Sequence, residues 1–142
     1  MTEQQVTSEK GTPRDVVRRY CDAWVRGDAA TLVGLYADDI VLHYFGQSPL
    51  AGDHAGKAAA LAALARISAL TKRGTPEIHD VLASDSHAAI LARESWMDGE
   101  TPVTVERVLL YHVRDGKLAE CWIYDADQRL VDAILSCPDS GS

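Results

Sequence analysis

The chain has 142 residues, of which 46% are hydrophobic and 25% are charged, a composition that supports one folded domain with its own core. Aspartates and glutamates number 21 against 14 lysines and arginines, so the net charge is −7. That charge argues against nucleic acid and against an anionic membrane surface as partners. No apolar run approaches the roughly 18 residues of a membrane span, and residues 1–11 lack the apolar stretch of a secretion signal, so we expect a cytoplasmic protein.

Cysteines and histidines give no sign of a metal or cofactor. Cys21, Cys121 and Cys137 are odd in number and have no CxxC spacing, so we expect reduced thiols. The histidines have no HxH or HExxH spacing, and neither a glycine-rich phosphate loop nor a GxSxG motif is present. We therefore expect one domain over 12–137 without metal or cofactor, flanked by a disordered tail over 1–11 and a second tail over 138–142.

The first half of the chain has helical patterning. Thr12 can cap a helix that begins at the following proline, and apolar residues then recur at helical spacing as far as Trp24. Gly27 ends this helix, and Asp28 can cap a second, short one. The composition beyond it predicts a strand over 39–45, a loop over 46–49 and an alanine-rich helix over about 56–70.

The second half changes from helical to alternating patterning after Pro76. Hairpin-length turns separate four strand candidates, and a short helix follows: strands over 78–83, 88–97, 103–114 and 118–125, and a helix over 128–136. Helices followed by a meander of antiparallel strands predict an α+β fold. A strongly curved sheet wrapped by helices would enclose one apolar cavity, where a small molecule could bind.

Several segments resemble a known superfamily. Residues 20–28 (YCDAWVRGD), 35–39 (LYADD) and 45–52 (FGQSPLAG) are similar to the nuclear transport factor 2-like (NTF2-like) superfamily, within its SnoaL-like polyketide cyclase and ketosteroid isomerase branch. Segments of the second half agree, and the resemblance covers about 13–135. It implies a cone-shaped, curved antiparallel sheet wrapped by N-terminal helices, an NTF2-like or cystatin-like α+β barrel with the pocket inside. It also implies a homodimer packed sheet to sheet.

The resemblance carries over to individual site residues only in part. Tyr20 matches the tyrosine with which ketosteroid isomerases stabilise a dienolate oxygen. The position of their general-base aspartate falls near His43 or Tyr44, and that of their second oxyanion-hole aspartate falls near Leu109. Two of the three groups are therefore replaced. The arginine–aspartate pairing of limonene-type epoxide hydrolases is not visible as a motif.

Strand alternation singles out Arg107. One face of 103–114 carries Arg107, Leu109 and Tyr111 among valines and should line the cavity. A buried guanidinium needs a partner. That partner could be an oxygen of a ligand, which makes Arg107 an anchor, or an internal carboxylate such as Asp127 or Glu94.

His43 and Asp127 are the candidate proton carriers. The unperturbed pKa of histidine, near 6.5, suits proton transfer, and the resemblance implies that the loop directly after His43 lies at the rim of the cavity. His43 could instead be structural, and if it faces the outer sheet, Tyr44 takes its place in the pocket. Of the two aspartates at the end of the last strand, we expect one to face the cavity as a general acid or base and the other to cap the final helix, and we assign the cavity role to Asp127 and the cap to Asp125.

Aromatic residues supply the predicted wall of the site. Tyr20 and Trp24 are four residues apart on one helical face, where they could pack in the core or offer a hydroxyl donor and a flat surface. The complete set of predicted ligand contacts is Trp24, Tyr44, Phe45, Trp96, Leu109, Tyr111, Trp122 and Tyr124. Three tryptophans in so short a chain suggest a flat ligand, although core packing explains them almost as well.

These residues lead to three hypotheses. The first is a cofactor-independent enzyme for a small apolar oxygenated molecule (polyketide-, steroid- or terpenoid-like). It would isomerise, cyclise or dehydrate the substrate by acid/base chemistry beside a carbonyl, with His43 or Asp127 moving the proton and Tyr20 and Arg107 stabilising the oxyanion. The second is a non-catalytic module that binds a hydrophobic small molecule. The third is a structural dimer with a self-filled pocket, which a cavity well below about 300 Å³ would favour. Val108 and Leu110, on the outer sheet face, suggest a homodimer.

Overall fold

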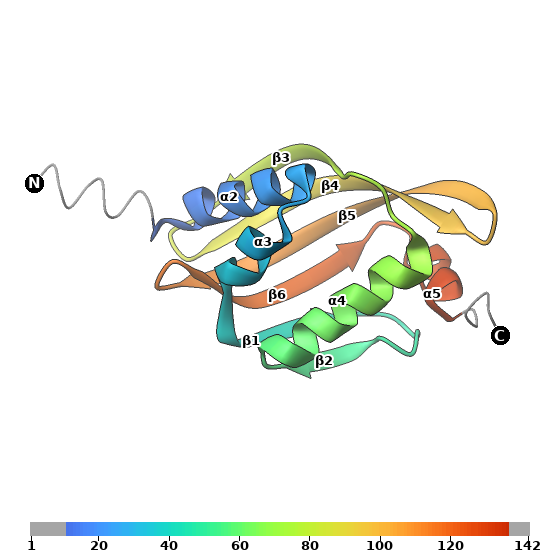
Figure 1. Ribbon diagram of the computed structural model, residues 1–142, viewed down its shortest axis with the longest axis horizontal. Helices are drawn as coiled ribbons and strands as arrows, with labels where there is room; N and C mark the ends of the chain where they lie inside the picture. The colour runs from blue at the N-terminus through green and yellow to red at the C-terminus, as the bar shows by residue number, and fades with distance from the viewer. Residues whose placement is uncertain (1–10, 137–142) are drawn as a thin grey trace, which may run out of the picture.

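The computed structural model describes residues 11–136 (Figure 1). Residues 1–10 of the predicted N-terminal tail, the predicted C-terminal tail and Cys137 lie outside the described residues. Within them, the helices are α2 (Pro13–Arg26), α3 (Ala29–Leu35), α4 (Lys57–Thr71) and α5 (Gln128–Ser136). The strands are β1 (Tyr36–Tyr44), β2 (Gly52–Ala55), β3 (Glu77–Ala83), β4 (His87–Asp98), β5 (Thr101–Arg114) and β6 (Lys117–Asp125).

The helix boundaries follow from local capping. The Asp15 backbone N–H donates to the Thr12 hydroxyl at 3.2 Å, and Gly27 ends α2 with φ 72°, a left-handed conformation that suits glycine. Asp28 then caps α3 by accepting from the backbone N–H of Thr31 at 3.2 Å. These caps confirm the sequence prediction for the N-terminal helices.

A single curved sheet of six strands, in the order β2-β1-β6-β5-β4-β3, forms the body of the molecule and does not close (Figure 1). The predicted α+β class is confirmed, with two differences in detail. β1 and β6 pair in parallel, because no hairpin joins them and most of the chain runs between them. β2 lies between the predicted loop and the predicted alanine-rich helix, where no element was predicted, since a four-residue edge strand carries too little pattern to detect.

Within residues 11–136, helices cover only one face of the sheet. α2 packs against β3, β4 and β5, while α4 packs against β1 and β2. The core between these layers contains Ile40 and Leu42 of β1, Leu109 of β5 and Ile123 of β6. The other face has no helix over it among the described residues, and it leaves Tyr124 46% exposed. No helix among residues 11–136 is long and apolar enough to cross a membrane.

Candidate functional site

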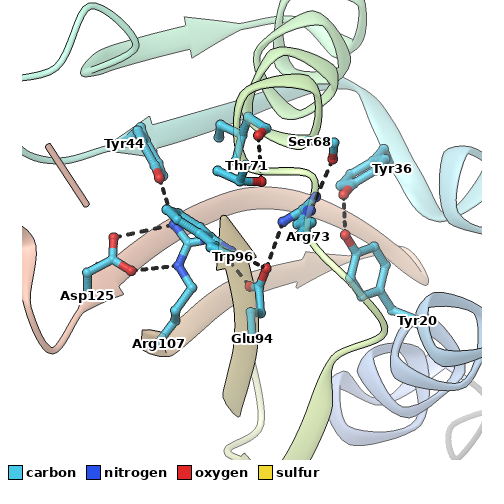
Figure 2. A network of polar contacts seen from close by, with 11 residues as sticks. Tyr20, Tyr36, Tyr44, Ser68, Thr71, Arg73, Glu94, Trp96, Arg107 and Asp125 are labelled. Carbon is cyan, nitrogen blue, oxygen red and sulfur yellow. Dashed lines mark hydrogen bonds and ion pairs between the residues drawn. The ribbon is translucent and has the colours of Figure 1, made fainter. Parts of the chain in front are cut away.

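Arg107 faces the interior, as strand alternation predicts. Its side chain is 1% exposed and its donors reach three groups (Figure 2). Nε and Nη2 donate to the two carboxylate oxygens of Asp125 at 2.6 and 3.3 Å, Nη1 donates to Glu94 Oε2 at 3.3 Å, and Nη2 also donates to the Tyr44 hydroxyl at 2.7 Å. The alternative of an internal carboxylate partner therefore holds, with Glu94 as expected and Asp125 in the place of Asp127.

Glu94 joins Arg107 to a second guanidinium. Its Oε1 accepts from Arg73 Nη1 at 3.1 Å and from the Trp96 indole N–H at 3.0 Å. Arg73 Nε donates to the Ser68 hydroxyl at 3.0 Å, and the Arg107 guanidinium lies 4.8 Å from the centre of the Trp96 ring. Arg73, Arg107, Glu94 and Asp125 thus form a buried cluster of two arginines and two carboxylates (Figure 2). No sequence motif predicts this cluster.

Burial and the charges within the cluster shift the pKa values of its members. Burial opposes the charge of Glu94, but Arg107 and Arg73 outweigh that effect and hold its pKa below the ordinary value. Burial raises the pKa of Asp125, and Arg107 offsets only part of the rise. Burial also raises the pKa of Tyr44 to about 12 despite the neighbouring Arg107, so Tyr44 is a neutral phenol at pH 7.

Three phenols and a thiol lie beside this cluster. The hydroxyls of Tyr20 (α2) and Tyr36 (β1) are 2.5 Å apart and hydrogen-bonded. Tyr111 bonds to Tyr20 and to Cys121. Burial raises the pKa of Tyr20, while its bonds from Tyr36 and Tyr111 work in the opposite direction. Burial raises the pKa of Cys121 to about 12, so all four groups are neutral at pH 7.

These side chains line an interior cavity of about 20 Å³, space for a single water molecule. Its polar wall consists of Tyr20, Tyr36, Tyr111, Cys121, Arg73 and Arg107, and Trp24 and aliphatic side chains complete it. The lining contains no carboxylate and no histidine. The volume is far below the roughly 300 Å³ of typical ligand pockets, which is the result that the third hypothesis predicts.

A larger hollow of about 390 Å³ is lined by residues on the opposite face of the sheet and also by Arg107 and Asp125 of the cluster. Leu91, Val108 and Tyr124 form its apolar part, while Arg93 and Glu106 pair at 3.3 Å on its border. This groove lies on the outer face, where the sequence predicts contact with a second copy.

His43 does not face the cavity. Leu42 and Tyr44 point inward from β1, so the residue between them points outward. Its Nδ1 lies 2.7 Å from an oxygen of Asp53 and its Nε2 lies 2.6 Å from an oxygen of Glu120, so that both nitrogens donate when the ring is protonated. The ring stacks on Trp122. The placement of His43 in the pocket is therefore wrong, and the alternative that Tyr44 takes the inward position holds.

Asp127 also lies outside the cavity. Its carboxylate accepts from the backbone N–H of Leu130 at 3.1 Å and so caps α5. The expectation that Asp127 faces inward is therefore wrong. That expectation placed Asp127 on the same face as Trp122 and Tyr124, but both of these residues lie on the outer face, opposite the partly buried Leu110 and Val108. Asp125 is the aspartate that turns inward.

The remaining predicted ligand contacts divide into two groups. Trp24, Leu109 and Tyr111 line the cavity as predicted, and Trp96 is buried against Arg107 without lining it. Phe45 is 39% exposed and stacks on Tyr124 at the outer side, so neither belongs to the cavity wall. The placement of Phe45, Trp122 and Tyr124 in the pocket is therefore wrong: the aromatic face of β6 points outward, and Cys121 and Ile123 of the same strand line the cavity instead.

Three residues of the polar wall, Arg73, Tyr36 and Cys121, are absent from the predicted site residues. Arg73 follows α4 in an irregular segment, where no periodicity indicates which way a side chain points. Tyr36 begins β1 three residues before the predicted strand, and an earlier strand start would have placed it inward. No group of three histidines, cysteines or carboxylates within 11–136 could hold a metal ion.

Known proteins resemble this chain in structure. A cystatin-like protein of unknown function from Xanthomonas campestris is 28% identical, with a TM-score of 0.79 over 89% of this chain and 99% of that one. Bal32a, from a soil-derived mobile gene cassette, is 25% identical, with a TM-score of 0.77 over 85% and 94%. A proposed polyketide cyclase from Sinorhizobium meliloti shares the fold at 24% identity, with a TM-score of 0.62 over 78% and 94%.

A search of curated proteins found no match. A family model for the SnoaL-like domain matches residues 17–121, most of the chain. The match agrees with the curved sheet and with the structural neighbours, and the chain belongs to the SnoaL-like domain family of the NTF2-like superfamily.

Proposed function

We propose that this protein is a cofactor-independent enzyme that polarises the carbonyl group of a small, mainly apolar molecule and catalyses isomerase- or cyclase-type chemistry. The observation that carries the proposal is the polar wall of the interior cavity. Two guanidiniums, three phenols and a thiol border a space of about 20 Å³, where aliphatic side chains would fill a core at lower cost. Family membership and the likeness to a proposed polyketide cyclase support this class of chemistry.

Tyr20 is the proposed oxyanion donor. Either hydroxyl can donate in the Tyr20–Tyr36 bond, and when Tyr36 donates, the hydrogen of Tyr20 is available to a ligand oxygen. Removal of a proton beside the carbonyl moves the C–H electron pair into a C=C bond and the carbonyl π pair onto oxygen. Hydrogen bonds to that oxygen stabilise the enolate. Reprotonation elsewhere gives an isomer, and attack on a second carbonyl of the same molecule closes a ring.

Asp125 is the best candidate for the proton acceptor. Burial raises the pKa of Asp125, whereas Arg107 and Arg73 lower the pKa of Glu94, the other carboxylate of the cluster. A raised pKa brings a carboxylate closer to the operating pH and makes it a more effective base. The side chain of Asp125 is 2% exposed, and Arg107 lies between it and the cavity. A ligand must therefore extend past Arg107 before Asp125 can accept its proton.

A ligand can enter only if the cavity widens. The lining residues with some solvent exposure are Trp24 of α2, Leu64 of α4 and Arg73 after α4. They come from different elements on the helical side, so their movement would leave the sheet unchanged. If the cavity were only a self-filled core, a buried charged cluster would give the fold no more stability than apolar side chains of the same volume. The presence of the cluster therefore argues against the third hypothesis.

A non-catalytic binding module is the second candidate. It is favoured by one observation, namely that no carboxylate and no histidine lines the cavity. Such a protein would hold a carbonyl oxygen through the same donors without moving a proton.

Hydrogen–deuterium exchange at the carbon beside a carbonyl separates the two functions. Small ketones such as acetophenone, together with 1,3-dicarbonyl compounds, would be incubated with the protein in D₂O and followed by NMR. We expect exchange above the background rate, a loss of about 100-fold in Tyr20→Phe, and a loss in Asp125→Asn. The matched controls Tyr124→Phe and Asp53→Asn, both on the outer face, should exchange like the parent protein. Binding without exchange would reject the enzyme in favour of the binding module.

The outer sheet face is the proposed dimer interface. Leu91, Val108, Leu110 and Trp122 lie there half-buried, and no helix among residues 11–136 covers them. Apolar side chains on a sheet face gain from burial against a second copy.

A further inference from the structure

Arg73 has a donor that the protein itself does not use. Nε bonds to Ser68 and Nη1 bonds to Glu94, while Nη2 has no hydrogen-bond partner among the described residues. The side chain is 17% exposed, lines the cavity and lies 5.8 Å from the centre of the Trp24 ring. No fully buried side-chain nitrogen or oxygen within 11–136 lacks a partner, so this donor is reachable from the cavity or from solvent.

Arg107 differs from Arg73 in this respect. Asp125, Glu94 and Tyr44 already accept hydrogen bonds from all three of its nitrogens. The free guanidinium edge at the cavity therefore belongs to Arg73, although Arg107 is the arginine that the sequence singles out. Figure 2 shows Arg73 between Glu94 and the hydrogen-bonded Tyr20–Tyr36 pair. Arg73, Tyr20 and Tyr36 line the same cavity.

The charge balance of the cluster limits what this edge can bind. Arg73 and Arg107 carry two positive charges, and Glu94 and Asp125 carry two negative charges, all in side chains that are 17% exposed or less. The sum is zero. A carboxylate ligand would add one uncompensated negative charge to a buried site, which is costly. A neutral carbonyl oxygen would accept the same hydrogen bonds and leave the balance intact.

We propose that Arg73 is the residue that recognises the substrate, and that its unused Nη2 edge selects a neutral carbonyl compound over the corresponding carboxylate. This inference rests on the proposed function, because it assigns the carbonyl-binding role within the same cavity. Trp24 beneath the guanidinium provides a flat surface beside the bound group. The substrate class is therefore an uncharged aromatic or planar ketone, aldehyde or lactone.

Acetophenone and benzoate form a suitable pair of probes, since they have nearly the same shape and differ in charge at neutral pH. Binding would be followed by NMR of the ¹⁵N-labelled tryptophan indoles of the full chain. Trp24 lines the cavity, whereas Trp122 lies on the outer face and reports binding elsewhere. We expect acetophenone to shift the Trp24 signal and not the Trp122 signal, and to bind at least about tenfold more tightly than benzoate.

Variants then assign the role to Arg73. Arg73→Gln should weaken acetophenone binding by about tenfold, and Arg73→Lys, which keeps a charged donor, should weaken it less. The control Arg129→Gln, at an exposed position of α5, should bind like the parent protein. Glu94→Gln leaves the cluster with one net positive charge and should therefore improve benzoate binding. Circular dichroism would confirm that each variant is folded.

Several results would overturn the inference. They are tighter binding of benzoate than of acetophenone by the parent protein, binding that shifts only Trp122, no binding of either probe, or unchanged affinity in Arg73→Gln. All are binding measurements, so they are independent of turnover. A protein that binds acetophenone through Arg73 but exchanges no protons would retain the inference and lose the proposed enzymatic function.

Discussion

At the scale of single residues, Tyr44 shows how the buried cluster depends on each partner. Its hydroxyl accepts from Arg107 at 2.7 Å, and without it one guanidinium donor keeps only the longer bond to Asp125. We expect Tyr44→Phe to lower the free energy of unfolding by about 1–3 kcal/mol, measured by urea denaturation. Tyr124→Phe is the matched control, because that side chain is 46% exposed, and it should change stability by less than about 0.5 kcal/mol. Equal effects of the two substitutions would contradict the importance of the cluster.

His43 makes a second prediction, on pH dependence. Burial lowers its pKa, but Asp53 and Glu120 outweigh that effect, so the pKa of the folded protein lies above the ordinary value of about 6.5. A raised pKa means that the stabilisation is fully present below about pH 6.5 and is lost as the pH rises through the pKa of the folded state. Urea denaturation from pH 6 to pH 9 should show this loss in the parent protein and a smaller one in His43→Gln. Parallel pH profiles for the two proteins would refute the prediction.

Some side chains of the site could be placed from the sequence, and others could not. Arg107 could be placed inward because its strand is long and one of its faces is otherwise apolar. His43 and Asp127 could not be placed, because both faces of β1 and of β6 carry apolar or aromatic side chains and the alternation therefore does not show which face is inward. Arg73 lies in an irregular segment and has no alternation at all. Pairs such as Arg107 with Asp125 depend on strand register, which spacing along one strand does not reveal.

At the scale of elements, α5 is held to the loop after β1 at a position that requires glycine. The backbone N–H of Gln47 donates to Asp132 at 3.0 Å, and Gln128 donates to the carbonyl of Phe45 at 3.3 Å. Gly46 has φ 110°, and a Cβ there would overlap the side chains of Asp132 and Gln128. A larger residue at Gly46 would be strained by this backbone conformation and would also displace the ends of the Asp132 and Gln128 side chains, which hold the helix to the loop.

The corresponding prediction compares two glycines. Gly46→Ala should lower the free energy of unfolding by about 1–3 kcal/mol through strain and steric overlap. Gly34→Ala, within helix α3 and with nothing near its Cβ position, should raise it by about 0.5–1 kcal/mol because alanine favours the helix. Urea denaturation measures both. Stabilisation by Gly46→Ala would show that α5 does not dock as described.

Helices and long strands were predictable from the sequence at this scale. Capping residues and hydrophobic spacing identified α2 and α3, and alternation with turn residues identified β4, β5 and β6. The parallel pairing of β1 with β6 was not predictable, because it depends on the curvature of the whole sheet rather than on any local segment.

At the scale of the whole molecule, one face of the sheet is covered by helices and the other is open, which leads to the proposed homodimer. Sedimentation at micromolar concentration should show a dimer. Leu110→Lys should shift it to monomer by placing a charge on the open face, whereas Val33→Lys, on the already exposed surface of α3, should not. A monomeric parent protein would refute the proposal.

The central claim concerns the interior, namely that the polar wall of the cavity holds a carbonyl oxygen rather than merely filling a core. The carbonyl stretching frequency of bound acetophenone, measured by infrared difference spectroscopy with a ¹³C-labelled carbonyl, tests this most directly. Strong donors weaken the C=O bond, so the band should lie below its position in an apolar solvent and move back towards it in Tyr20→Phe. A bound probe whose band stays at the apolar-solvent position, or one that Tyr20→Phe leaves unchanged, would contradict the account.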